Sequence, residues 1–422
     1  MKWATSNGIP FVTKSGGHSP WSSIGQEGVV VDLTKIQEIT INKSNETVTI
    51  SGSVLSKQVS VALAAEGLFT RVCICVLPVD YVGRRQADLV LYLAMSNGNT
   101  VGAMPYFLGG GNNPFLATTG YASDNIIAAR VVTASGDLMS ADSANNEDLF
   151  WALRGAGQHF GLVTSVTVRT YPLSTLGSPS GALWSEAFVF PLDRAAEVAE
   201  AMKPLMSDAT YNTTGLMMAA CPPPAFQPAL VVSAKLIGDP KDALVAFKVL
   251  YDLKPLAKIG GETQIEDLGN SLDRACAKGG FKHYGLMGAR EFSPGRFGDT
   301  VQLWRKLIAT CPDAKGSIFY FEWHSRPTKK PDEESAMSHH DVQFWQGNLL
   351  WFEKEESSTS ALAIYDQVLQ VVREGQPKID FPNSTRTWPV EWRYRGEGRL
   401  ARLRAVKQQW DPTGVFTDQF LD

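Results

Sequence analysis

The sequence has 422 residues, of which 44% are apolar and 19% are charged, and its formal net charge is −4. This length allows two or three domains with buried cores, and the composition excludes a disordered or fibrous chain. The slight negative charge and scattered basic residues give no polyanion-binding signature, so we expect no nucleic-acid partner. No apolar run is long enough to span a bilayer, so we expect no membrane partner either.

The chain begins with MKWATSNGIPF, which lacks the apolar core of a signal peptide. Four N-x-S/T sequons, at Asn42, Asn45, Asn212 and Asn383, would suit a secreted protein. The five cysteines have scattered spacings that predict neither a disulfide framework nor a zinc site. Localisation therefore stays open on these features alone.

Residues 28–68 predict three strands followed by a helix. The β-branched runs lie in GVVVDLTKIQEITIN (28–42) and NETVTISGS (45–53). Leu55, Val59 and Leu63 then recur at helical spacing, and Gly67 suits the C′ position of that helix. This order is typical of an α+β unit.

Glycines punctuate the chain densely from residue 97 to residue 127. Two strands around a Ser-Gly turn follow at 128–141. NNEDLFWALRGAG (145–157) predicts a short helix with acidic residues in its first turn. Residues 160–173 predict a strand of high β propensity.

From about residue 176 to residue 385, strands and helices alternate more evenly. We predict strands at 182–190, 228–238, 316–324 and 344–353, and helices at 192–206, 240–253 and 359–375. The last two strands are rich in aromatic residues, which either line a broad pocket or form a core face packed under helices. Residues 399–410 predict a basic amphipathic helix that ends before Pro412.

Three glycine-rich turns at 14–19, 100–102 and 109–113 carry many backbone N–H groups. Successive amides in such turns form an anion-binding concavity, so together they are suited to a pyrophosphate. The hydroxyls of Ser19 and Thr100 would add donors. His18 follows the first turn directly.

Several common catalytic motifs are absent from the sequence. There is no G-x-S-x-G elbow, H-E-x-x-H helix, Walker loop or strand opening into G-x-G-x-x-G. The histidines are spread out, and only His339 and His340 are adjacent, where neighbours do not face one metal. We therefore expect no metal.

Four sequence strings occur in the order seen in one known family: KSGGHS (14–19), TVGAMPYFLGGG (100–111), DLFWALRG (148–155) and FGLVT (160–164). With RLARLRAVKQQWDPTGVF (399–416) they resemble the berberine-bridge-enzyme-like FAD-linked oxidoreductases of the vanillyl-alcohol-oxidase and p-cresol-methylhydroxylase superfamily. The resemblance implies an α+β fold with a two-subdomain, PCMH-type FAD-binding domain at 1–175. It also implies a substrate domain with an antiparallel sheet at 176–385, and a segment at 386–422 that returns to the FAD domain.

The resemblance implies FAD as cofactor, held through the flavin 8α-methyl group by His18. Many members have a second link to a cysteine, whose position here is Gly98, so we expect a single histidyl link. The cofactor-binding residues implied are Lys14, Ser15, Gly16, Gly17, His18, Ser19, Thr100, Val101, Gly102, Gly109, Gly110, Gly111, Asp124, Asn125, Ile126, His159, Gly161, Leu162 and Val163. His159 replaces the family's asparagine, and is either a new polar contact to the cofactor or a harmless substitution.

The family's acid–base residues do not transfer to this sequence, because the Tyr-x-Asn-Tyr motif is missing and WPVEW (388–392) is its nearest counterpart. The catalytic base is unassigned. Titratable residues on segments that could face the flavin are the candidates: Glu391, Tyr394, His340, Glu322 and His324.

Two features depart from the family. The first strand and most of the following helix are absent, so the chain resembles an N-terminally truncated member; the family suggests a secretory route. Residues 71–96 have no family counterpart, and are either a real loop or translated non-coding sequence. We predict that this segment is the least regular part of the first domain.

These features predict an FAD-dependent oxidase that takes hydride from a hydrophobic or aromatic alcohol, or a specialised metabolite, to flavin N5. Dioxygen would be the electron acceptor, and the partners would be this small molecule and dioxygen. The alternative is a non-redox cyclase or an inactive copy on the same scaffold. The sequence leaves the oligomeric state open.

Overall fold

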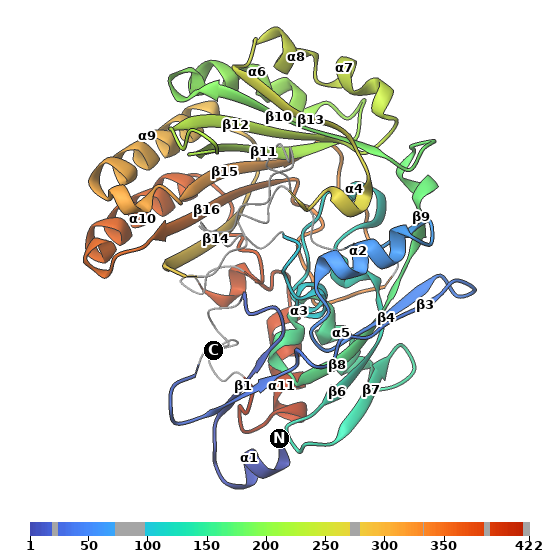
Figure 1. Cartoon of the computed structure of the whole chain (residues 1–422). Helices are drawn as coiled ribbons and strands as arrows, with labels where there is room; N and C mark the ends of the chain where they lie inside the picture. Colours follow the sequence, from blue (N-terminus) through green and yellow to red (C-terminus); the bar gives the residue numbers. More distant parts are fainter. Residues whose placement is uncertain (19–23, 72–97, 271–278, 332, 384–388, 417–422) are drawn as a thin grey trace.

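The computed structural model describes residues 1–18, 24–71, 98–270, 279–331, 333–383 and 389–416. Within these ranges the chain forms two large antiparallel sheets, one at each end of the molecule (Figure 1). A five-stranded sheet is built from residues 39–169, and a seven-stranded sheet from residues 183–352. Antiparallel sheets combined with helices confirm the predicted α+β class.

The five-stranded sheet has the strand order β3-β4-β8-β6-β7. Its strands are β3 (Ile39–Asn42), β4 (Thr47–Ser51), β8 (Leu162–Arg169), β6 (Ile126–Val132) and β7 (Leu138–Asp142). Val48, Ile50, Val166 and Val168 are fully buried, and branched residues at alternate positions explain why these runs form strands. Helices α2 (Ser56–Ala64), α3 (Ala103–Leu108) and α5 (Glu147–Ala156) contribute to the same core.

Short elements surround this sheet. Strand β1 (Phe11–Lys14) pairs in parallel with β2 (Val29–Asp32), and β5 (Leu68–Phe69) pairs with β9 (Tyr171–Pro172). Helix α1 (Lys2–Ser6) precedes β1, and α4 (Leu116–Thr119) follows the third glycine turn. Helix α11 (Arg399–Trp410) packs against α5, so the end of the described chain lies beside its first half (Figure 1).

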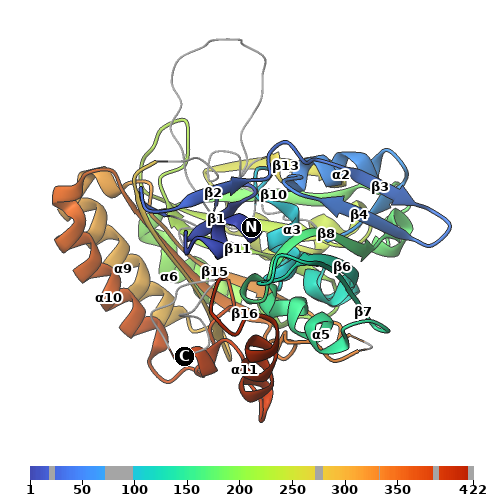
Figure 2. The same cartoon turned by 90° about the horizontal axis from the view of Figure 1, so that it is seen from below.

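The seven-stranded sheet has the order β13-β10-β12-β11-β15-β16-β14. These strands are β13 (Ala257–Thr263), β10 (Leu183–Pro191), β12 (Ala229–Leu236), β11 (Thr213–Ala220), β15 (Ile318–His324), β16 (Phe344–Phe352) and β14 (Phe281–Ala289). Helices α6 (Ala195–Ser207), α9 (Pro294–Thr310) and α10 (Ser358–Arg373) cover its outer face (Figure 2). Short helices α7 (Ala243–Ala246) and α8 (Lys248–Asp252) lie at its edge.

The aromatic strand β15 packs into a hydrophobic core on each of its two faces. Phe319, Phe321 and Trp323 belong to the core under the helices, whereas Ile318 and Tyr320 belong to a separate core on the inner face. Alternate strand residues point to opposite faces. The inner face is therefore turned toward the first half of the chain, which Figure 1 shows below the sheet.

The structure corrects several predicted elements. The single helix predicted at 240–253 is interrupted at Phe247, which separates α7 from α8. Helix α2 ends with Ala65 as its C-cap, so Gly67, at φ +70°, lies beyond the C′ position. Strands β11, β13 and β14 and helix α9 were not predicted. Strand β11 is buried throughout, whereas β13 is largely exposed, and pairing with strands distant in sequence holds both.

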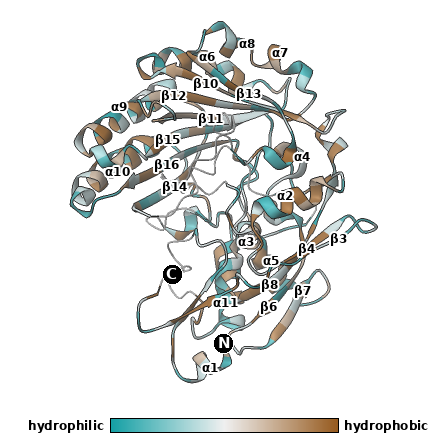
Figure 3. Cartoon of the chain, in the orientation of Figure 1, coloured by the Kyte–Doolittle hydropathy of each residue, from teal (hydrophilic) through white to brown (hydrophobic). Residues whose placement is uncertain are grey.

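Figure 3 shows hydrophobic residues along the strands of the seven-stranded sheet and a mixture of hydrophobic and hydrophilic residues on the helices outside it. This pattern is expected where each helix buries one face and exposes the other. Among the residues that the structure describes, no helix is long and apolar enough to cross a membrane.

Candidate cofactor and substrate site

The first two glycine turns are in direct contact. A Cβ atom on Gly16 would lie 2.5 Å from the backbone nitrogen of Gly102, and one on Gly102 would lie 2.5 Å from Ser15 Oγ. Real Cβ atoms do not come this close, so only glycine lets the two backbones approach. The turn that follows β1 therefore closes onto the residues immediately before α3.

His18 lies on this contact. Its Nε2 atom is 3.0 Å from Thr100 Oγ1, although 82 residues separate the two in the chain. The imidazole is half-buried, so one edge reaches solvent. The structure thus brings His18, Thr100, Gly16 and Gly102 together. Ser19 lies outside the described residues.

The same contact carries backbone N–H groups that have no hydrogen-bond acceptor among the described residues. In the described part of the chain, the N–H groups of Gly16, Gly17 and Gly102 donate no hydrogen bond. The Gly17 backbone is left-handed, at φ +72°. Converging amides of this kind bind anions without lysine. Lys14 adds no free charge, because its ammonium is 2.8 Å from Asp32 and lowers the pKa of that carboxyl to about 2.

The third glycine turn does not join the first two. The six residues of α3, about 9 Å at a rise of 1.5 Å each, separate Gly102 from Gly109. Gly110 and Gly111 are left-handed and pack on Met337 and Ala122, respectively. The turn then leads to Asn112, whose Nδ2 donates to Glu322 Oε1 on β15 at 2.9 Å. The third turn therefore connects the cofactor region to the inner face of the seven-stranded sheet.

Asp124 and Asn125 are buried and already paired within the protein. Asp124 accepts a hydrogen bond from Tyr121 N at 2.8 Å and lies 3.0 Å from His340 Nε2. Asn125 donates to Tyr121 O and accepts from Tyr171 OH. Ile126 begins β6 and is buried in the core of the five-stranded sheet. These three residues are thus packed within the protein, next to the third glycine turn in the chain.

Arg71 packs beside these residues, which the sequence did not predict. It is 1% exposed, and its Nη1 atom donates to Tyr121 O at 2.6 Å. Burial lowers the pKa of Arg71 to about 10. Arg71 is therefore packed against the described chain. The rest of the predicted segment 71–96 lies outside the described residues, so its irregularity stays a prediction.

His159 contacts the C-terminal part of the chain. Its ring is fully buried, with Nε2 2.8 Å from Tyr394 OH, and its carbonyl accepts from Lys407 Nζ at 2.7 Å. Gly161 allows close approach to β6, since a Cβ there would lie 2.4 Å from Val131 Cγ1. Leu162 and Val163 pair with β6 and are buried, and Val101 is buried beside Gly102.

The candidate bases occupy different surroundings. Glu391 is exposed. The hydroxyl of Tyr394 is hydrogen-bonded to His159, and the imidazole of His340 lies within hydrogen-bond distance of the Asp124 carboxylate. Glu322 and His324 face inward on β15, with His324 Nε2 3.2 Å from Glu322 Oε1. Glu322 Oε2 has no hydrogen-bond partner among the described residues. Of the candidates, Glu322 is thus the buried carboxyl that contacts the third glycine turn.

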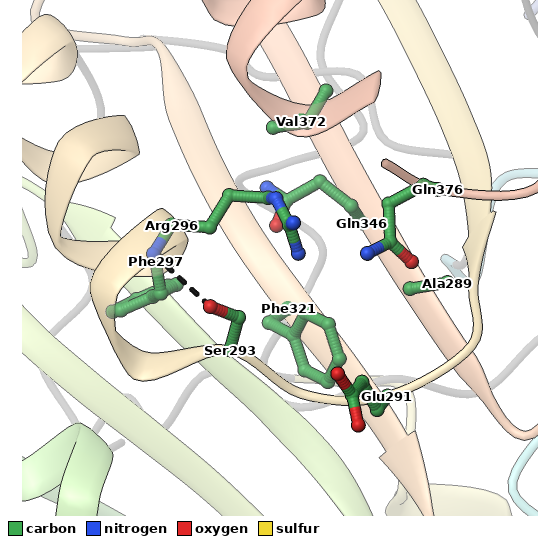
Figure 4. A pocket seen from close by; sticks show the side chains of 9 residues that line it. All are labelled: Ala289, Glu291, Ser293, Arg296, Phe297, Phe321, Gln346, Val372 and Gln376. Atoms are coloured by element: carbon green, nitrogen blue, oxygen red, sulfur yellow. Dashed lines mark hydrogen bonds between the residues drawn. The ribbon is translucent and has the colours of Figure 1, made fainter. Parts of the chain in front are cut away.

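Two hollows lie away from this region. Ala289, Arg296 and Gln376 help to line one on the helix side of the sheet, beside β14, α9 and α10 (Figure 4). Its volume of about 10 Å³ suits at most one water molecule. The other, of about 530 Å³, is an open depression between the β6–β7 turn and the end of α11, near Ser135 and Trp410. Neither contacts the glycine turns.

Comparison with known proteins agrees with this arrangement. A family model described as "FAD binding domain" matches residues 1–76. The chain is 26% identical to the FAD-linked oxidoreductase hasG of Aspergillus fumigatus over 443 residues, covering 98% of this chain and 86% of that protein. Over nearly its whole length the chain thus resembles FAD-linked oxidoreductases.

Solved structures of other flavin enzymes share the fold. Wild-type BBE-like 1 of Physcomitrella patens superimposes with a TM-score of 0.78 and 18% identity, covering 99% of this chain and 87% of that one. The 6-hydroxy-D-nicotine oxidase of Arthrobacter nicotinovorans gives a TM-score of 0.77 and 20% identity, covering 98% and 86%. Among FAD-linked oxidoreductases, a glycine-built contact with unused amides is a fitting place for the cofactor's pyrophosphate.

Proposed function

We propose that the chain oxidises a small, largely apolar alcohol, or a related specialised metabolite, with dioxygen as electron acceptor. Bound FAD would supply the redox chemistry, taking a hydride from the substrate carbon and passing two electrons to dioxygen to give hydrogen peroxide. The unused amides of Gly16, Gly17 and Gly102 would hold its pyrophosphate, and His18 would form the single covalent link. The hydrogen bond between His18 and Thr100, at the contact that carries those amides, is the observation that supports this proposal most directly.

Glu322 is the proton acceptor we propose for the substrate hydroxyl. His324 Nε2 lies 3.2 Å from Glu322 Oε1, and its Nδ1 lies 3.1 Å from Thr214 Oγ1. With the ring proton on Nε2, His324 donates to Glu322 Oε1 and Glu322 can stay ionised. Asn112 Nδ2 donates to the same oxygen, so Oε2 is left to take the proton. A positioned carboxylate of this kind contributes roughly 10²–10⁴-fold to such steps.

An apolar substrate is consistent with the inner face of the seven-stranded sheet. Leu216, Met218, Val231 and Leu286 lie on this face with Tyr320 and are nearly fully buried. Such a surface removes apolar parts of a ligand from water, which is the main driving force for binding them.

An absorbance spectrum of the purified protein tests the cofactor assignment. We expect flavin bands that stay with the pellet after acid precipitation, and bleaching by benzylic alcohols under nitrogen with recovery in air. A colourless protein that takes up no FAD would contradict the proposal and favour an inactive copy. A yellow protein that no alcohol bleaches would contradict the substrate class.

The variant Glu322→Gln tests the base separately. We expect flavin content to be unchanged and the anaerobic bleaching rate to fall about 10²–10⁴-fold. Glu353→Gln is the matched control, because Glu353 is an exposed carboxylate just after β16. Equal bleaching rates in the two variants would exclude Glu322 as the proton acceptor.

A further inference from the structure

A row of four polar residues crosses the inner face of the seven-stranded sheet. Strand register places Ser185 opposite Lys235, Lys235 opposite Thr214, and Thr214 opposite His324. Opposite residues on one face have Cβ atoms about 5 Å apart, so the four side chains are successive neighbours. Their exposed fractions lie between 1% and 4%. We call Ser185, Lys235, Thr214 and His324 the polar row.

The next row along the strands continues this polar surface. Ser233 and Glu322 lie there on either side of Leu216, which pairs with both. Asn112 reaches this surface from the third glycine turn through its contact with Glu322. The polar row and these three residues form a compact polar surface between the sheet and the loop.

Several atoms on this surface have no hydrogen-bond partner within the described chain. They are Ser185 Oγ, Ser233 Oγ, Asn112 Oδ1 and Glu322 Oε2. Each belongs to a residue at least nine-tenths buried. Buried polar atoms are normally paired, because leaving one unpaired costs the desolvation of that group. Unpaired atoms from three strands and a facing loop indicate a ligand group that would pair with them.

The remainder of the inner face is apolar. Moving along β11 from Thr214, the inward residues are Leu216, Met218 and Ala220, all in the inner-face core. On β12 the inward residue beyond Ser233 is Val231. A ligand lying along this face would therefore meet an apolar surface over most of its length and a polar surface at one end.

We propose that this surface is a subsite for the hydroxyl groups of a substrate whose remainder is apolar. The atoms require both roles from the ligand: Asn112 Oδ1 only accepts, whereas the serine hydroxyls can donate. A neutral hydroxyl can both donate and accept. The inference rests on the proposed function. It adds that one end of the substrate carries hydroxyl groups.

The test uses calorimetric binding of two probes to the purified, flavin-containing protein. The probes are 3,4-dihydroxybenzyl alcohol and benzyl alcohol, which differ only in two ring hydroxyls. We expect tighter binding of the dihydroxy probe. The double variant Ser185→Ala/Ser233→Ala should lose roughly tenfold in affinity for it and leave benzyl alcohol unchanged. Ser207→Ala, at an exposed position at the end of α6, should change neither.

Thermal unfolding of the free double variant gives a second readout. Its two hydroxyls have no partner within the described chain, so their removal should leave the midpoint unchanged or raise it. Equal or undetectable binding of both probes, or an unchanged affinity in the double variant, would overturn the subsite. A fall in the unfolding midpoint would show that the two hydroxyls stabilise the folded protein, which would also overturn the subsite. Flavin bleaching is measured separately, so failure of the proposed function is distinguishable from failure of the subsite.

Discussion

His18 Nε2 lies 3.0 Å from Thr100 Oγ1, where the turn after β1 meets the residues that precede α3. This hydrogen bond fixes the orientation of the imidazole beside the unused amides of Gly16 and Gly102. Under the proposed function, this contact would therefore affect how readily a flavin becomes linked to His18.

Replacing Thr100 by Val removes the hydrogen bond and keeps the shape of the side chain. We expect a several-fold smaller fraction of acid-stable flavin, measured from the absorbance of the supernatant after precipitation. Thr100→Ser retains the hydroxyl and should behave like the unchanged protein. His18→Ala should release all of the flavin, and acid-stable flavin in that variant would show that the link lies elsewhere.

Gly16→Ala tests the close approach of the two turns. The added Cβ would lie 2.5 Å from Gly102 N, so the turns must separate. We expect FAD affinity to fall at least tenfold in a titration of the cofactor-free protein, together with a lower unfolding midpoint. Gly298→Ala in α9 is the control, since a Cβ there meets no atom within 4 Å. Tight FAD binding by Gly16→Ala would show that the contact between these two turns does not bind the cofactor.

Tyr394→Phe separates the two roles that the sequence allowed for His159. The hydroxyl removed is 2.8 Å from the buried His159 Nε2. If His159 anchors the C-terminal segment, the free energy of unfolding should fall by about 1–3 kcal/mol, measured by urea unfolding. The flavin spectrum should not change. A shifted flavin absorbance with unchanged stability would instead indicate that His159 acts on the cofactor.

His339 makes stability depend on pH. Its imidazole is fully buried beside Trp345 and Phe381, and burial holds its pKa well below the usual value of 6.5. The unfolded chain binds a proton below pH 6.5 that the folded chain does not. Stability is therefore complete above pH 6.5 and falls by up to about 1.4 kcal/mol for each pH unit below it.

The substitution His339→Leu should flatten this dependence. We expect the difference in unfolding midpoint between pH 7 and pH 5 to be smaller in the variant than in the unchanged protein. His283→Leu is a useful comparison, because desolvation lowers the pKa of His283 also, but His283 lies at an exposed position of β14. An unaltered pH profile in His339→Leu would assign acid sensitivity to other groups.

The amino-acid sequence by itself determined many of the local elements, the glycine turns and the resemblance to FAD-linked oxidoreductases. Alternating branched residues specify strands such as β4 and β8 through contacts with near neighbours, and glycine marks where backbones must approach. The tertiary structure alone decided which distant residues meet. Asn112 and Glu322 are 210 residues apart, and the polar row exists only because four strands pair in one register. Arg71 likewise meets Tyr121, 50 residues away in the chain, only in the folded structure. Such contacts depend on strand pairing and burial over the whole chain, and no local pattern encodes them.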